Sequence, residues 1–257
     1  AVRLPRRTEV DVLRLDSGKL QAQLTDVDVV VNAVGVMSRD AAVLETVHHH
    51  AMRQIAEAAV QAGVSRWVQL SALGADAAHS VAFLGSKGRG DAAVAASGLA
   101  VNIARPSVVY GRGGASCELF LKLARLPYVV LPERGRFMLQ PVHVTDVAAG
   151  LGRMVAQPLP TGSVVAMVGS EAMTLADYLS TLRQTVHGRS PLRVGKVPSS
   201  LLDMSLPLSN VLTNGMLSRD SMRLLQQGSC ADAQAFAALL GRLPLGVSAF
   251  AAADRHG

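Results

Sequence analysis

Three adjacent histidines, His48, His49 and His50, are the densest group of metal-ligating side chains in the sequence. Consecutive helical residues point about 100° apart, so all three cannot hold one metal ion. The two cysteines, Cys117 and Cys230, have no CxxC partner and cannot form a disulfide framework, which indicates buried thiols in a reducing compartment. We therefore predict a mixture of packed and exposed imidazoles and no metal site.

A second group of chemical interest closes a valine-rich run. Residues 26–31 are dense in valine, which predicts a buried parallel strand, and the four residues that follow are Asn32, Ala33, Val34 and Gly35. Ligands of α/β proteins bind at the carboxyl ends of strands, and glycine lets the backbone approach a ligand closely. We predict that these four residues contact a ligand; a simple strand-to-loop turn is the alternative.

The composition places these side chains in a folded protein. Of the 257 residues 49% are hydrophobic and 17% are charged, which gives a sizeable core and argues against disorder. The net charge is +6, spread thinly, which favours an anionic small ligand, an acidic partner or a membrane surface over DNA. Aromatic residues are 4%, so stacking platforms for nucleic acid are not expected. No apolar run reaches the roughly 18 residues that span a bilayer.

Short strands alternate with alanine-rich helices in the first half of the chain. The pattern predicts strands over 26–35, 66–71 and 99–110, and helices over 39–62 and 82–97, with Gly63 capping the first helix. This order is typical of a parallel α/β sheet. After residue 112, further helices over 115–125, 143–155 and 174–187 and a strand over 162–169 indicate a smaller mixed α/β lobe.

Three sequence blocks carry a family resemblance. They are HHHAMRQIAEAAVQAGVSRWVQLSALGAD from His48, RPSVVYGRGG from Arg105 and LQPVHVTDVA from Leu139. In this order and spacing they resemble the extended and atypical short-chain dehydrogenase/reductase superfamily. The branch they resemble most includes the nucleotide-binding accessory subunit of respiratory complex I and bacterial epimerase/dehydratase-like homologues. The resemblance covers roughly residues 1–240.

The resemblance implies a Rossmann-like, doubly wound parallel sheet. Residues 1–112 with about 143–169 would form the dinucleotide-binding domain, and about 113–142 with 170–257 a C-terminal lobe for a substrate or partner. Superfamily members open with a strand, a Gly-rich turn and a helix that hold the pyrophosphate. The sequence instead starts at the equivalent of the second strand, AVRLPRR, so we expect the first strand and glycine turn to be missing from it. A GxGxxA string over 88–93 lies inside a helical stretch and is interpreted as chance.

The active-site pattern departs from that of the superfamily. Active members use Ser, Tyr and Lys, with the tyrosine four residues before the lysine and its hydroxyl transferring the proton. Ser71 and Lys87 match this pattern, but Phe83 stands where the tyrosine belongs. Phenylalanine cannot act as an acid or base, a role that typically contributes about 10²–10⁴-fold. The resemblance therefore implies a degenerate site with Ser71 and Lys87 as remnants beside the nicotinamide; a surface lysine is the alternative for Lys87.

The resemblance also implies contacts to the adenosine half of the dinucleotide. Arg3 and Arg7, with Arg6 between them, would meet the ribose, where a guanidinium suits a 2′-phosphate and favours NADP(H) over NAD(H). A solvated basic N-terminus is the alternative. Asp16, at the end of a strand expected over 10–16, would lie near the adenine or cap the next helix.

The last predicted contact lies at the end of the strand over 99–110. There Pro106, Ser107 and Val108 would pass the nicotinamide; a core strand running into a proline bend is the alternative.

Three hypotheses for function follow. The first is a structural or redox-sensing NAD(P)(H)-binding subunit of a larger or membrane-associated assembly, on the matrix side of the mitochondrial inner membrane or in the bacterial cytoplasm. The second is an active NAD(P)-dependent reductase or epimerase acting on a carbonyl or nucleotide-sugar substrate. The third is an interaction scaffold without a nucleotide.

Overall fold

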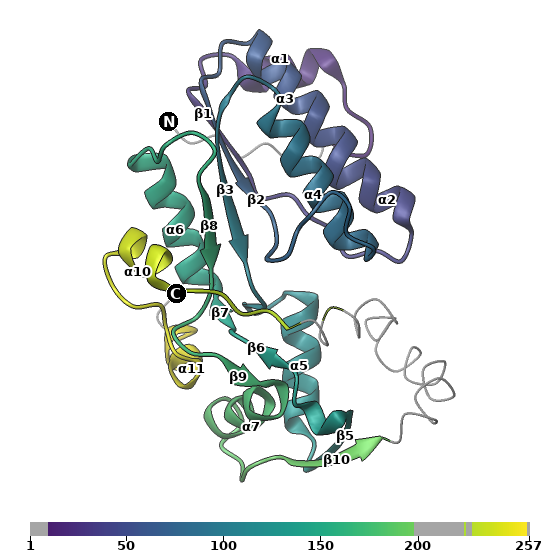
Figure 1. The fold of residues 1–257 in the computed structure, drawn as a ribbon, viewed down its shortest axis with the longest axis vertical. Helices are drawn as coiled ribbons and strands as arrows, with labels where there is room; N and C mark the ends of the chain where they lie inside the picture. Colours follow the sequence, from purple (N-terminus) through teal and green to yellow (C-terminus); the bar gives the residue numbers. More distant parts are fainter. Residues whose placement is uncertain (1–9, 198–223, 225–227, 256–257) are drawn as a thin grey trace. The chain divides into compact units, whose positions relative to one another are not determined.

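The computed structural model describes residues 10–197, 224 and 228–255, and its central element is a parallel sheet (Figure 1). Strands β1 (Val29–Asn32), β2 (Arg66–Leu70), β3 (Ala100–Pro106) and β8 (Val164–Met167) follow the order β1-β2-β3-β8. The first three run parallel and in register, so that Val30, Trp67 and Val101 lie side by side. The predicted parallel α/β sheet is confirmed.

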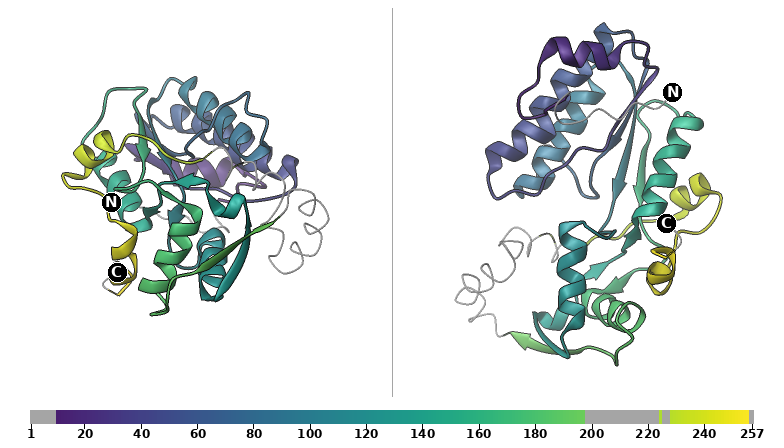
Figure 2. Two further views of the ribbon diagram at one scale, coloured as in Figure 1. Left: turned by 60° about the horizontal axis from the view of Figure 1, so that its bottom comes forward. Right: turned by 180° about the vertical axis from the view of Figure 1, so that it is seen from behind.

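Helices cover both faces of this sheet, as in a doubly wound fold. On one face α1 (Ser17–Leu24), α3 (Ala51–Gln61) and α4 (Ala82–Ala95) lie next to one another (Figure 1). Residues 151–156, the C-terminal part of α6 (Val144–Ala156), lie on the other face (Figure 2). The core under the first layer is built mainly from large apolar side chains of these helices and strands: Leu20, Leu24, Met52, Ile55, Trp67, Val94, Val101 and Ile103.

The helix predicted over 39–62 contains an irregular turn. It consists of α2 (Ala41–Glu45), a π-helical turn (Thr46–His50) and α3 without a break between them. Gly63 follows with a φ of +80°, a conformation that glycine adopts without strain, so the predicted glycine cap is confirmed.

The chain divides into two compact units. The first holds the described residues up to Arg105 together with Leu151–Val165, and the second holds Pro106–Gly150 and the described residues from Ala166 onward. Whether the two units correspond to a dinucleotide domain and a substrate or partner lobe stays a prediction.

The second unit has its own core and short, mixed secondary structure. Its elements are β4 (Val109–Tyr110), α5 (Ala115–Arg125), β5 (Tyr128–Pro132), a 3-10 turn (Glu133–Gly135), β6 (Met138–Leu139), β7 (Val142–His143), β9 (Met173–Thr174), α7 (Leu175–Thr185), β10 (Arg193–Val197), α10 (Gln234–Leu240), a 3-10 turn (Val247–Ala249) and α11 (Phe250–Ala253). Phe120, Tyr178 and Phe250 are buried among aliphatic residues of α5 and α7. None of the described helices is both long and apolar enough to cross a membrane.

Two predicted strands differ from the structure. The strand expected over 10–16 is wrong: the Arg14 amide donates to the Asp11 carbonyl at 2.9 Å, which makes a turn, and α1 begins directly afterwards. The strand expected over 99–110 is interrupted after Pro106 and resumes as β4. The AVRLPRR segment lies outside the described residues.

Candidate functional site

Helix α4 approaches its neighbours closely because of its glycines. A methyl group on Gly88 would overlap the backbone of Asp76 and Ala77, and one on Gly90 would overlap the carbonyl oxygen of His48. These glycines therefore serve helix packing, and the GxGxxA string is part of a helix, as the sequence predicts. The close approach brings α4 side chains under the ends of β1 and β2.

Lys87 is one of these side chains, and it is buried rather than on the surface. Only 5% of the residue is exposed. Its Nζ donates to the Val34 carbonyl at 3.2 Å and to the Leu70 carbonyl at 3.1 Å. Burial lowers the pKa of Lys87 to about 8, against the opposing effect of the Asp91 carboxylate. Lys87 thus joins the carboxyl end of β2 to the loop after β1.

His48 holds the same loop from the π-helical turn. The residue is 1% exposed, and its Nε2 accepts a hydrogen bond from the Val36 amide at 3.0 Å. The ring proton must then sit on Nδ1, which donates to Ser86 Oγ at 2.9 Å. Burial, with the nearby charge of Lys87, lowers the pKa of His48 to about 4, so the ring is neutral at physiological pH.

The loop after β1 is exposed but fixed. Ala33, Val34 and Gly35 are exposed, whereas the side chain of Asn32 is buried. Asn32 Oδ1 accepts from the Val34 amide at 3.0 Å, and its Nδ2 donates to Gln69 Oε1 at 2.9 Å. Asn32 therefore positions the loop, and the backbone of the next three residues stays accessible to a ligand.

Ser71 follows β2 and belongs to a buried polar chain. Its hydroxyl donates to Asp91 Oδ2 at 2.7 Å, and Arg105 forms an ion pair with the same oxygen at 3.0 Å. Burial raises the pKa of Asp91, although the hydrogen bonds from Ser71 and Arg105 oppose that shift. The Ser71 hydroxyl thus already donates its hydrogen bond to a side chain of the protein.

Phe83 lies one helical turn before Lys87 and packs against His48. The two rings meet edge to face, with centroids 5.5 Å apart and an interplanar angle of 86°. In this set Lys87 supplies an ammonium group and Ser71 supplies a hydroxyl that already donates to Asp91, but Phe83 supplies no phenol. Such a site can bind a polar ligand beside the loop after β1, and Lys87 is the titratable side chain of this set.

Other predicted site residues have separate places in the structure. Asp16 caps α1 by accepting from the Lys19 amide at 3.0 Å, so its expected capping role is confirmed, and its contact with adenine stays a prediction. Arg3 and Arg7 lie outside the described residues.

The three residues predicted beside the nicotinamide come after the chain enters the second unit. The Ser107 amide donates to the Met167 carbonyl at 3.1 Å, and the Val108 carbonyl accepts from the Val142 amide at 3.0 Å. Pro106 ends β3 and is buried. The contact of Pro106, Ser107 and Val108 with a ligand stays a prediction.

Two residues of the site and one contact escaped the sequence interpretation. Asp91 lies four residues after Lys87, a spacing that places both on one helix face, and Arg105 opens one of the motif blocks. These two features of the sequence could have predicted the ion pair between Asp91 and Arg105. The bond between His48 and Val36 had no comparable signal, because it depends on the π-helical turn.

Acid is expected to weaken the fold through His48. The folded protein keeps the ring neutral down to about pH 4, whereas the unfolded chain takes up a proton near pH 6.5. The unfolded state therefore binds more protons between these values, and stability falls as the pH falls. At pH 5 the loss relative to pH 7.5 is about 2 kcal/mol from this group.

Urea unfolding at both pH values measures the loss. The His48→Gln variant lacks the titrating ring. Its free energy of unfolding should therefore fall by about 2 kcal/mol less than that of the wild type between pH 7.5 and pH 5. An equal pH dependence in wild type and variant would contradict the assignment.

Comparisons with known proteins agree with the fold and its ligand class. Residues 3–120 match a family described as NAD(P)H-binding. Over 193 residues the chain is 26% identical to the NADH-ubiquinone oxidoreductase 40 kDa subunit of Neurospora crassa mitochondria, covering 74% of this chain. The match spans 48% of that protein, so the chain spans about half the length of this curated relative.

Solved structures share the fold at lower identity. An NADPH-dependent quinone oxidoreductase from Escherichia coli, in complex with NADPH, superposes with a TM-score of 0.70 at 18% identity, covering 93% of this chain and 81% of that one. A nucleoside-diphosphate-sugar epimerase from Staphylococcus aureus gives 0.70 at 15% identity, covering 94% and 81%. A tyrosine-to-phenylalanine mutant of a Bacillus cereus UDP-glucuronic acid 4-epimerase, solved with NAD, gives 0.66 at 17% identity, covering 93% and 76%. The chain thus has a Rossmann-like fold, and its residues 3–120 match an NAD(P)H-binding family.

Proposed function

We propose that this chain, with its NAD(P)-binding domain over residues 3–120, holds a nicotinamide dinucleotide without using it for efficient catalysis. The observation that carries the proposal is Phe83, packed edge-on against buried His48 at the position of a proton-transferring tyrosine. Binding to the folded state stabilises a protein by roughly 2.7 kcal/mol at a ligand concentration 100 times the Kd. A bound dinucleotide therefore has a structural or redox-sensing use without turnover.

The ribose and nicotinamide would lie at the loop after β1. The accessible backbone of Ala33, Val34 and Gly35 supports this placement, and Gly35 allows the closest approach because a methyl group there would lie 3.3 Å from Lys87 Nζ. Lys87 is mostly protonated at pH 7 because its pKa is about 8, and two of its three N–H groups are used. The third N–H can donate to a ribose hydroxyl.

The remaining contacts are carried over from the resemblance as proposals. Asp16 would meet the adenine, and Pro106, Ser107 and Val108 would pass the nicotinamide. Arg3 and Arg7 would meet a 2′-phosphate and favour NADP(H), which a comparison of the Kd values for NADPH and NADH tests directly.

The cellular setting is also a proposal. The Neurospora relative is named as a mitochondrial NADH-ubiquinone oxidoreductase subunit, which supports a role within a larger, membrane-associated assembly on the matrix side. The bacterial cytoplasm is the alternative location. Co-purification of the tagged full-length protein with partner subunits tests the assembly.

Restoring the phenol is expected to create activity. Wild-type protein should bind NADPH or NADH and oxidise it slowly, if at all, across a panel of carbonyl and nucleotide-sugar substrates. Phe83→Tyr should raise the rate with at least one substrate by about 10²-fold or more, because it supplies an acid beside Lys87. Loss of absorbance by NADPH measures the rate, and Phe83→Leu, which changes packing without adding a hydroxyl, should stay inactive.

The same assay separates the competing functions. Rapid turnover by the wild type would support an active reductase or epimerase, with Ser71 acting through water in place of the missing phenol. Absence of binding to both dinucleotides would support an interaction scaffold. The Bacillus epimerase solved with NAD as a tyrosine-to-phenylalanine mutant supports the view that a phenylalanine in such a fold is compatible with a bound dinucleotide.

A further inference from the structure

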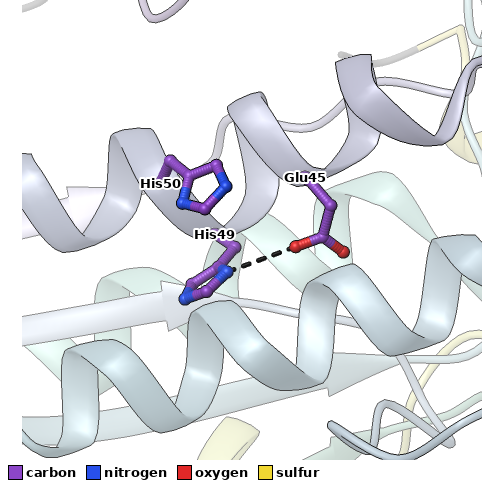
Figure 3. A group of neighbouring side chains, drawn as sticks. All are labelled: Glu45, His49 and His50. Carbon is purple, nitrogen blue, oxygen red and sulfur yellow. Dashed lines mark hydrogen bonds and ion pairs between the residues drawn. The ribbon is translucent and has the colours of Figure 1, made fainter.

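Two of the three adjacent histidines share a helix face with an acidic residue (Figure 3). Ligating atoms of Glu45, His49 and His50, one from each side chain, all lie within 4.8 Å of one another. His49 Nδ1 is 3.2 Å from Glu45 Oε2. His48 points into the core, where its Nε2 accepts from the Val36 amide, and it takes no part in this group.

The π-helical turn is what brings this group together. In an α-helix, His50 would lie about 140° around the axis from Glu45, five residues at about 100° each. In a π-helix each residue advances by roughly 80°, because the hydrogen bonds join residues five apart. His49 and His50 then fall on either side of Glu45. The expectation of no metal site assumed regular helix geometry, which the turn over Thr46–His50 does not have.

The group is also open to solvent and has a suitable donor set. The side chains of His49 and Glu45 are 25% and 27% exposed, and His50 is exposed. Two imidazole nitrogens and one carboxylate oxygen suit zinc and related divalent ions, with water completing the coordination. We propose that Glu45, His49 and His50 form a binding site for a divalent transition-metal ion of the zinc type.

Arg89 sets the orientation of the carboxylate. Its Nε donates to Glu45 Oε1 at 2.9 Å and to Oε2 at 3.1 Å, and a terminal nitrogen contacts Oε1, so Arg89 touches both oxygens and holds Oε1 more closely. Oε2 also faces His49, and an ion would bind this oxygen in place of its longer contact with Arg89 Nε. Carboxylate ligands are commonly hydrogen-bonded on their other oxygen in this way, although the positive charge of Arg89 lowers the affinity for a cation.

Binding requires a small movement. Ligands at about 2.0–2.2 Å from a tetrahedral ion are roughly 3.4 Å apart. The pair His49 Nδ1 and Glu45 Oε2 is already at 3.2 Å, whereas the limit for the whole group is 4.8 Å. The exposed His50 ring would turn inward from its stack on His49, where the ring centroids are 4.7 Å apart, and the zinc ion would replace the contact between His49 and Glu45.

Zinc titration of the untagged protein tests the site. Calorimetry should show one saturable Zn²⁺ site per chain, and His50→Gln should weaken it by about tenfold or more. Because His50 is exposed, His50→Gln should leave the fold intact, and circular dichroism of the variant checks this. Co²⁺ should give the visible absorption of a low-coordinate nitrogen and oxygen site in the wild type and lose it in His50→Gln.

A histidine outside the group supplies the control. His187 of the second unit is half-buried, with Nε2 bonded to the Leu121 carbonyl at 3.1 Å, and His187→Gln should leave the Zn²⁺ affinity unchanged. A wild type without saturable Zn²⁺ binding overturns the proposal. Equal affinity in wild type and His50→Gln also overturns it, as does an equal loss in both variants.

Discussion

Replacing Gly90 with alanine is expected to destabilise the protein by about 3 kcal/mol or more, or to prevent folding. The added methyl group would overlap the carbonyl oxygen of His48, which is backbone and cannot rotate away. Helix α4 and the π-helical turn must then separate, and the packing between them is lost. Urea or thermal unfolding of purified protein measures the change.

Gly152 provides a matched control in another helix. It lies inside α6, is exposed, and has no neighbouring atoms within 4 Å of an added methyl group. Alanine should therefore stabilise the protein here by up to about 1 kcal/mol, because it restricts the unfolded chain and favours helix. Similar unfolding curves for Gly90→Ala and Gly152→Ala would show that the close approach of α4 is not required.

The contact between Gly90 and His48 also affects the loop after β1. Gly90 allows α4 to lie against the carbonyl of His48, and the side chains of His48 and Lys87 hold the loop after β1 from opposite elements. A small glycine thus fixes where an exposed loop can meet a ligand. The close packing of α4 therefore requires glycines that weaken the helix by propensity.

The sequence predicted the elements whose signals are local. The valine run before Asn32 gives β1, and the alanine-rich pattern ending at Gly63 gives the long helix. Its error over 10–16 has a local cause as well. Val10 to Leu15 suit a strand by composition, but Asp11 accepts from the Leu13 amide at 3.1 Å and closes a turn that competes with it.

The sequence could not predict features that depend on contacts between distant segments. The π-helical turn shifts the helix by one residue, and periodicity of 3.6 gives no sign of it. Lys87 could equally have been a surface residue, because its burial depends on carbonyls at Val34 and Leu70, 53 and 17 residues away. The family resemblance placed Ser71, Phe83 and Lys87 in one site, but only the structure identified the partners of each.

Removing the Asp91 carboxylate is expected to cost about 3 kcal/mol. Asp91 is 3% exposed, and Asp91→Ala leaves Ser71 without its acceptor and the Arg105 guanidinium without its counter-charge. The cost arises because Ser71 and Arg105 lose their partner, and not because the ion pair is strongly attractive in net terms. Burial raises the pKa of Asp91 by more than the contacts with Ser71 and Arg105 lower it. Urea unfolding at pH 7 measures the loss.

Two further variants separate these causes. Glu57→Ala breaks an ion pair with Arg53 whose atoms are 3.9 Å apart and whose side chains are more than half exposed, so it should change stability by less than about 0.5 kcal/mol. The double variant Asp91→Ala, Arg105→Met removes both buried charges and should recover most of the lost stability. If the double variant is as unstable as Asp91→Ala alone, the stranded Arg105 charge is not the source of the cost, and the loss lies in Ser71 or in packing around α4.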